Sequence, residues 1–175
     1  MRFDRKQLLI YAVTDKAWTG KLSLEEQVEE ALKGGATMVQ LREKELDKGN
    51  FEEVLRTACA IRKITEKYNV PLIIDDNLEL ALACHADGLH VGQDDMDAGL
   101  ARKLLGPDRI LGVTAKTVEQ ARKACAQGAD YLGSGAVFGT TTKSDARPMT
   151  METLRAICAC SDIPVVAIGG ISLEN

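Results

Sequence analysis

Apolar runs of strand length recur along the chain, and a stretch with helical periodicity follows each of them. The runs occupy residues 8–13, 38–41, 71–74, 88–91, 110–113, 130–134 and 164–168. They are too apolar to have a face in water, which is typical of strands in a parallel sheet with both faces covered. Strict alternation of such strands with helices predicts an α/β fold.

Capping signals mark where several of the predicted helices begin. Ser23-x-x-Glu26, Asn50-x-x-Glu53 and Thr117-x-x-Gln120 each have the spacing in which two side chains satisfy backbone amides at a helix start. Gly34-Gly35 ends the first of these helices. We see no linker or low-complexity segment, so the sequence predicts one domain over residues 1–175.

The position of the polar residues distinguishes an open sheet from a barrel. Nearly every apolar run ends, on its carboxyl side, in groups that bind anions or carry out chemistry. An open sheet places its ligand at one switch point, whereas a barrel brings all strand ends to one mouth. The pattern therefore predicts a (β/α)8 TIM barrel of which about seven units are present. We expect the eighth strand and the last helices to be missing, as in a truncated barrel, unless the ring closes in another way.

Composition and charge narrow the classes of partner and compartment. The net charge is −4, from 22 basic and 26 acidic residues, which favours neither nucleic acid nor an anionic membrane as a partner. The charged start of the chain leads into an apolar run too short for a signal peptide or a membrane span. The five cysteines lack C-x-x-C spacing, and small core residues in a reducing cytoplasm explain them best. We expect a cytoplasmic protein; the sequence carries no sign of its oligomeric state.

A loop after the sixth run concentrates hydrogen-bond donors. Thr140, Thr142 and Lys143 lie in the segment 137–145, and Gly135 before it and Gly139 within it allow the backbone to approach a ligand closely. Hydroxyls with a single ammonium suit a phosphate or a diphosphate. The spacing fits neither a Walker loop nor the dinucleotide fingerprint. The alternative is a polar surface turn.

Two further sets of polar residues follow other strands. Gln40, Arg42 and Lys44 alternate, so an extended segment projects them to one side, where they suit a polyanion. Asp76 and Asp95 follow the third and fourth runs, and two carboxylates beside a phosphate are typical ligands of Mg²⁺. The alternatives are a solvated strand end for the first set and helix capping for the second. Asp75 and Asp94 compete with their neighbours as metal ligands.

Six short motifs occur in order from the first run to the last. They are Tyr-x-Val-Thr-Asp at 11–15, Gln-x-Arg-Glu-Lys at 40–44, Asp-Gly-x-His-x-Gly-Gln at 87–93, Gly-Ala-Asp-Tyr at 128–131, Thr-x-Thr-Lys at 140–143 and Ala-Ile-Gly-Gly-Ile at 167–171. Together they resemble the thiamine phosphate synthase family. The resemblance implies a (β/α)8 barrel and a transferase of thiamine biosynthesis. Such an enzyme joins 4-amino-5-hydroxymethyl-2-methylpyrimidine diphosphate to 4-methyl-5-(2-phosphooxyethyl)thiazole, with Mg²⁺, and gives thiamine phosphate and pyrophosphate.

The resemblance also implies roles for individual residues. Arg42 and Lys44, with Gln40 beside them, would hold the diphosphate of the pyrimidine, and Lys143 would meet the departing pyrophosphate. Arg42, Lys44 and Lys143 would thus be the catalytic residues, and Asp76 and Asp95 the Mg²⁺ ligands. Further substrate contacts would come from Asp75, Thr114, Thr140, Thr142 and Gly170.

The chain departs from the family pattern at several positions. Asp75 stands where the family usually has Asn, Thr114 where Ser is common, Lys116 where His is frequent and Gly139 where Pro is frequent. Because the eighth strand is expected to be absent, we expect the chain to bind the diphosphate and to hold the thiazole poorly. A thiazole tautomerase of the same barrel family and a phosphate-ligand binder without turnover are the alternatives.

Overall fold

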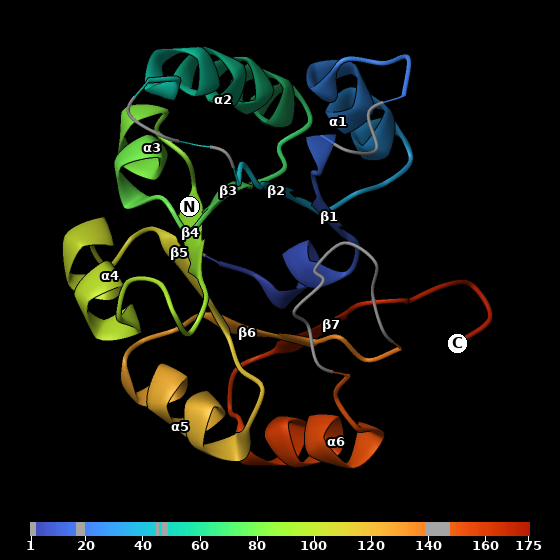
Figure 1. The fold of residues 1–175 in the computed structure, drawn as a ribbon, viewed down its shortest axis with the longest axis vertical. Coiled ribbons are helices and arrows are strands. Elements are labelled where there is room, and N and C mark those ends of the chain that lie inside the picture. The colour runs from blue at the N-terminus through green and yellow to red at the C-terminus, as the bar shows by residue number, and fades with distance from the viewer. Residues whose placement is uncertain (1–2, 17–19, 45, 47–48, 139–147) are drawn as a thin grey trace. The chain divides into compact units, whose positions relative to one another are not determined.

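The computed structural model describes residues 3–16, 20–44, 46, 49–138 and 148–175. The chain falls into two compact units, one formed by Met1–His90 with Leu105–Ile110 and the other by Val91–Leu104 with Leu111–Asn175. We call them unit 1 and unit 2 and describe each by itself (Figure 1). A single barrel domain over residues 1–175 stays a prediction.

Unit 1 contains parallel strands in chain order. They are β1 (Tyr11–Val13), β2 (Met38–Leu41), β3 (Leu72–Asp75) and β4 (Gly88–Val91); Val91 itself belongs to unit 2. The register places Val13 opposite Gln40, Gln40 opposite Ile73, and Asp75 opposite His90. The carboxyl ends of these strands therefore lie along one edge of the unit.

The helices of unit 1 pack beside one another along the strands (Figure 1). They are α1 (Leu24–Lys33), α2 (Phe51–Lys67) and α3 (Leu78–Ala83), and a short 3-10 helix, η1 (Arg5–Leu8), precedes β1. The capping box predicted at Ser23 is confirmed, since its hydroxyl accepts from the Glu26 amide at 3.2 Å and the Glu26 carboxylate accepts from the Ser23 amide at 2.8 Å. The helix start predicted at Asn50 is confirmed, because α2 begins directly after it, but Asn50 makes no side-chain capping bond.

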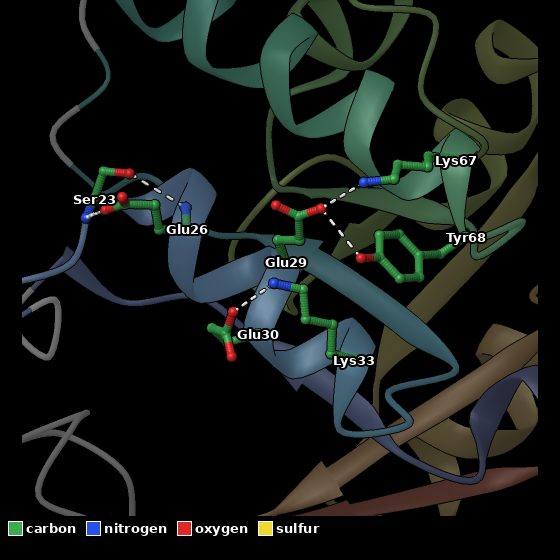
Figure 2. Close-up of polar contacts among 7 residues, drawn as sticks. All are labelled: Ser23, Glu26, Glu29, Glu30, Lys33, Lys67 and Tyr68. Carbon is green, nitrogen blue, oxygen red and sulfur yellow. Dashed lines mark hydrogen bonds and ion pairs between the residues drawn. The ribbon is translucent and has the colours of Figure 1, made fainter.

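A polar cluster joins α1 to the end of α2. Glu29 Oε1 accepts from Lys67 Nζ at 2.8 Å and from the Tyr68 hydroxyl at 3.1 Å, so the carboxylate lies between the two side chains (Figure 2). These bonds hold the pKa of Glu29 below its ordinary value, and the same carboxylate raises the pKa of Lys67. The cluster is exposed, so it fixes how the two helices align more than it stabilises them.

Unit 2 repeats the alternation. Its elements are α4 (Ala98–Leu105), β5 (Ile110–Thr114), α5 (Val118–Ala126), β6 (Tyr131–Gly135), α6 (Met151–Cys160) and β7 (Val165–Ile168); Leu105 and Ile110 themselves belong to unit 1. β6 pairs in parallel with both β5 and β7, with Gly112 opposite Tyr131 and Ser134 opposite Ala167. α5 packs against α6. Parallel strands covered by helices in both units confirm the predicted α/β class.

The predicted first strand is only partly a strand. Asp4 and Gln7 form a capping box that starts η1, and this turn uses the beginning of the apolar run. Leu9 is left 75% exposed, and β1 does not begin until Tyr11. An apolar run thus predicted the strand, but the local capping chemistry set where it begins.

A repeated contact joins the strands at their amino ends. The residue before β2, β4 and β6 donates its amide to the backbone carbonyl at the start of the preceding strand, and its side chain accepts from the amide of that same residue. The pairs are Thr37 with Ile10, Asp87 with Leu72, and Asp130 with Leu111, with side-chain bonds of 2.9, 2.8 and 2.7 Å. We call these three contacts the amino-end staples. They fix the register at the edge opposite the strand ends that carry the predicted site.

The described part of the chain has an aliphatic core. Its largest fully buried side chains include Met38, Ile61, Leu111 and Leu132, with Tyr131 as the aromatic member. Cys84 is buried, and loss of water raises the pKa of its thiol to about 11. Within the described residues, no helix has the length and apolar character needed to cross a membrane.

Candidate functional site

The end of β2 carries a buried amide and a buried guanidinium. Gln40 and Arg42 are 6% and 9% exposed. Gln40 Nε2 donates to the Tyr11 hydroxyl at 2.8 Å, which turns the amide towards β1. Lys44 follows in the same segment. The alternative of a solvated strand end is wrong for Gln40 and Arg42, which are buried, whereas Lys44 is exposed. That all three project to one side stays a prediction.

Arg42 lies between two carboxylates from the neighbouring strands. Its Nη1 is 3.4 Å from Asp15 Oδ2, after β1, and its Nε is 3.5 Å from Asp75 Oδ2, at the end of β3. Both distances exceed the usual length of a charge-assisted hydrogen bond. No described residue bonds to the third nitrogen, Nη2. The group is thus oriented while part of its donor edge remains for a ligand.

Residues 14–16 hold the segment that contains Arg42. Thr14 Oγ1 accepts from the Arg42 amide at 3.0 Å, and the Thr14 amide donates to the Gln40 carbonyl at 2.9 Å. Lys16 forms an ion pair with Glu43, whose side chain is only 7% exposed. Sequence reasoning did not find Asp15 or Lys16 as site residues. The signal was their place directly after the first strand, where the other strand ends carry their polar groups.

The chain turns sharply after β3. Asp76 has a φ of +59°, in the left-handed region that Asp tolerates better than most residues, and its amide donates to the His90 carbonyl at 2.8 Å. Asn77 then caps α3 by accepting from the Leu80 amide. Neither aspartate caps this helix, so the capping alternative is wrong for Asp75 and Asp76. His90 is 8% exposed on β4, opposite Asp75.

In unit 2, the loop after β4 holds Asp95. Its Oδ2 accepts from the Gly92 amide at 3.0 Å, while Oδ1 has no partner among the described residues. Gln93 Nε2 donates to the Thr114 carbonyl at 2.5 Å, which ties this loop to the end of β5. A carboxylate oxygen that is left unpaired in this way suits a hard cation.

A cavity of about 200 Å³ lies between this loop and α5. Asp97 lines it, caps α4 by accepting from the Gly99 amide at 3.0 Å, and accepts from Gln127 Nε2 at 2.8 Å. The Gln127 bond, followed by that from Lys123, lowers the pKa of Asp97 to about 2. Because Asp97 caps α4, the capping alternative is also wrong for Asp94 and Asp95. Asp97 also pairs with Lys123 of α5, which indicates a tie between the helices, whereas Asp95 lines the same cavity without a charged partner among the described residues.

The ends of β6 and β7 approach closely. A Cβ on Gly135 would lie 2.3 Å from the Ile168 carbonyl oxygen, so this position accepts only glycine. The Val137 amide donates to that carbonyl, and the Phe138 amide donates to the Gly169 carbonyl. Gly170 follows with a φ of +65°. Thr140, Thr142 and Lys143 lie outside the described residues.

The structure therefore groups the predicted residues as follows. Unit 1 brings together Gln40, Arg42 and Asp75 at neighbouring strand ends, with Asp76 next in the chain. Unit 2 carries Asp95, Thr114 and Gly170 at the ends of its own strands and their loops. Within the described residues no cluster has three metal-binding side chains. A cation held here would thus need oxygen ligands from a substrate, as Mg²⁺ commonly does.

Two sequence relatives and one solved structure resemble this chain over most of its length. A thiamine-phosphate synthase from Ruminiclostridium cellulolyticum is 51% identical over 166 residues, which cover 95% of this chain and 78% of the relative. Thiamine-phosphate synthase 2 of Streptococcus pneumoniae is 48% identical over 172 residues, covering 98% and 80%. A solved thiamine phosphate pyrophosphorylase from Pyrococcus furiosus has a TM-score of 0.86 at 38% identity, covering 98% of this chain and 79% of its own.

The sequence model of one family covers nearly all of the chain. It matches residues 10–175, from the strand that supplies Tyr11 to the end of the chain. The motifs at the strand ends, the buried Arg42 and the relatives near 50% identity agree with this match. The chain belongs to the thiamine monophosphate synthase (TMP-TENI) family.

Proposed function

We propose that this chain is a thiamine-phosphate synthase. It joins 4-amino-5-hydroxymethyl-2-methylpyrimidine diphosphate to 4-methyl-5-(2-phosphooxyethyl)thiazole and releases pyrophosphate. The observation that carries the proposal is Arg42, a buried guanidinium held at a strand end beside Gln40, in a chain 51% identical to a protein of that name. A buried cation with a donor edge left over suits a diphosphate.

The fold proposed for the working enzyme is the (β/α)8 barrel, with residues 1–175 supplying seven of its units in one domain. Parallel strands in both units and the TM-score of 0.86 to a solved pyrophosphorylase support it. In such a barrel the carboxyl ends of the strands form the site.

The residues divide into groups by the part of the substrates that they contact. Arg42 and Lys44 bind the diphosphate of the pyrimidine, with Gln40 and Asp75 next to it. Thr140, Thr142 and the Gly170 backbone bind the thiazole phosphate, with Thr114 nearby. Lys143 stabilises the pyrophosphate as it leaves. Arg42, Lys44 and Lys143 thus carry the catalytic role because they offset the charge that develops on the leaving group.

Asp76 and Asp95 are the proposed Mg²⁺ ligands. Their donor set fits, because both are carboxylates that follow strands and Asp95 Oδ1 has no partner among the described residues. Bound Mg²⁺ would supply Lewis-acid stabilisation of the diphosphate. The small-molecule substrates are the partners that this site requires.

The chain's own groups act by binding and orientation. Departure of the diphosphate leaves a pyrimidine methylene cation, whose charge the amino-pyrimidine ring delocalises, and the thiazole nitrogen then forms the new bond. No protein nucleophile is required, so positioning and charge stabilisation account for the catalysis.

Pyrophosphate release tests the proposal. We expect release only when both substrates and Mg²⁺ are present, and a loss of about 100-fold in kcat/KM for Arg42→Ala, because a charge-stabilising donor is removed. Lys33→Gln, on the exposed face of α1, is the matched control and should keep full activity. No release from the unchanged protein would contradict the synthase assignment and would favour a tautomerase or a non-catalytic binder.

Unchanged turnover of Asp95→Ala at saturating Mg²⁺ would remove Asp95 from the metal site.

A further inference from the structure

We propose that Asp15 is a positioning residue that holds the Arg42 guanidinium in the orientation in which it receives a diphosphate. This inference rests on the proposed function and deepens it, because it explains how the diphosphate site is built. The carboxylate of Asp15 lies after β1, whereas the residue that it acts on follows β2.

The first support is the geometry around the guanidinium. Asp15 Oδ2 faces Nη1 at 3.4 Å and Asp75 Oδ2 faces Nε at 3.5 Å, so carboxylates approach two different nitrogens. A planar guanidinium restrained at two nitrogens has little rotational freedom left. Its third nitrogen, Nη2, has no partner among the described residues.

The second support is the anchoring of the segment that carries Asp15. The residues on both sides of Asp15 hold the β2 end: Thr14 through the Arg42 amide at 3.0 Å and Lys16 through Glu43. The backbone at Asp15 is therefore fixed relative to the backbone at Arg42. The short side chain of Asp15 can therefore set the direction of the guanidinium. A displacement of about 1 Å at such a group lowers the catalytic rate strongly.

If Asp15 acted through its charge alone, its removal would change anion binding in the opposite direction. Asp15 and Asp75 together offset more than the single charge of Arg42, so a carboxylate there repels an anionic ligand. If Asp15 acted only as a competing charge, its removal would strengthen anion binding. If Asp15 positions Arg42, its removal weakens anion binding. The sign of the change thus separates the two roles.

Calorimetry with inorganic pyrophosphate and Mg²⁺ provides a test that does not depend on turnover. We expect Asp15→Ala to weaken pyrophosphate binding about tenfold and to raise KM for the pyrimidine diphosphate similarly, with KM for the thiazole phosphate unchanged. Asp15→Asn keeps an acceptor oxygen and should recover most of the loss. In an Arg42→Ala background, Asp15→Ala should have no further effect.

Glu30→Ala is the matched control, because it removes a carboxylate from an exposed ion pair on α1 without touching the guanidinium or the segment that carries Asp15. It should leave pyrophosphate affinity unchanged, and thermal unfolding verifies that each variant is folded. Tighter binding by Asp15→Ala or Asp15→Asn, an unchanged affinity, or an undiminished effect in the Arg42→Ala background would overturn the inference. Pyrophosphate binding that follows the expected pattern, in a protein that releases none from the two substrates, would reject the synthase proposal and leave the role of Asp15 intact.

Discussion

Asp75 is a carboxylate at a position where the resemblance leads one to expect the amide of asparagine. Its contact with Arg42 explains why a carboxylate is tolerated there. Its Oδ2 lies 3.5 Å from Arg42 Nε, and its side chain is 11% exposed. An asparagine at this position would offer an amide oxygen to the same nitrogen. We therefore expect Asp75→Asn to keep KM for the pyrimidine diphosphate within about threefold, whereas Asp75→Leu, which removes the acceptor from a buried charged donor, should raise it more than tenfold. Steady-state kinetics with the pyrimidine diphosphate varied measures both, and equal effects of the two variants would contradict an acceptor role.

At this scale the sequence predicted the members of the site better than their supports. Gln40 and Arg42 could be recognised because their alternation puts them on one side of an extended segment, and both are buried at one strand end. The place of Asp15 directly after the first strand was a signal, but its role depends on which strand lies beside β1 and in which register. Such pairing is set by tertiary packing, and one strand's own residues do not reveal it.

At the scale of the elements, the amino-end staples are expected to contribute to stability without a role in catalysis. Asp87 accepts from Arg62 Nη1 at 2.7 Å as well as from the Leu72 amide, and Asp130 accepts from Arg102 Nη2 at 2.6 Å as well as from the Leu111 amide. We expect Asp87→Ala to lower the free energy of unfolding by about 3 kcal/mol and Asp130→Ala by about 2 kcal/mol, as charged hydrogen-bond acceptors are lost. Asp87 matters more because Arg62 Nε already lacks a partner, whereas Arg102 Nε keeps the Gly128 carbonyl.

Urea unfolding measures these differences in the free energy of unfolding. Thr37→Val is the comparison in which the side-chain group that is lost carries no charge. Thr37 forms the same staple with a hydroxyl, so its loss should cost only about 1 kcal/mol. All three changes lie at the amino ends of the strands, so kcat/KM of the folded variants should stay within about twofold of the unchanged protein. A loss of activity without a loss of stability would place these residues in the site instead.

The bounds of the helices and strands match those predicted from the sequence where packing and local hydrogen bonding favour the same bounds. β2 and β4 have the predicted bounds, because the apolar run there meets no competing local bond. The first strand was predicted too long, since the Asp4 and Gln7 capping box takes part of the run into η1. Asn50 has the spacing of a capping box, but its backbone conformation is not the extended one that a cap requires. The motif therefore marked the helix start correctly, since α2 begins at Phe51, but it did not reveal that the side-chain capping bond is absent.

At the scale of the whole molecule, the stability should fall on the acid side of neutrality. Asp97 and Glu29 have pKa values below their ordinary ones because each carboxylate is hydrogen-bonded in the fold, Asp97 first by Gln127 and Glu29 first by Lys67. A lowered pKa means that the unfolded chain binds the proton more readily, so this stability is present above the ordinary pKa and is lost as the pH falls. For Asp97 the loss runs from about 4 down to about 2. The raised pKa of Lys67 acts in the other direction, and its contribution is lost only as the pH rises past the ordinary lysine range.

The fall in stability at acid pH can be assigned by changing Asp97 and its partner Gln127 separately. We expect the urea midpoint of the unchanged protein to be flat from about pH 6 to 8 and to fall below about pH 4, as paired carboxylates become protonated. Asp97→Asn should flatten the part of the fall that lies between pH 4 and 2. Gln127→Ala should shift that part to higher pH, because Gln127 is the first cause of the lowered pKa. Asp97→Asn keeps the capping oxygen Oδ1, which accepts from the Gly99 and Leu100 amides, and replaces Oδ2, the acceptor for Gln127 and Lys123, with an uncharged amide group. Both variants keep the cap of α4, so a change in the midpoint profile reports on the tie between α4 and α5. A profile identical to that of the unchanged protein in both variants would show that the tie contributes nothing to stability.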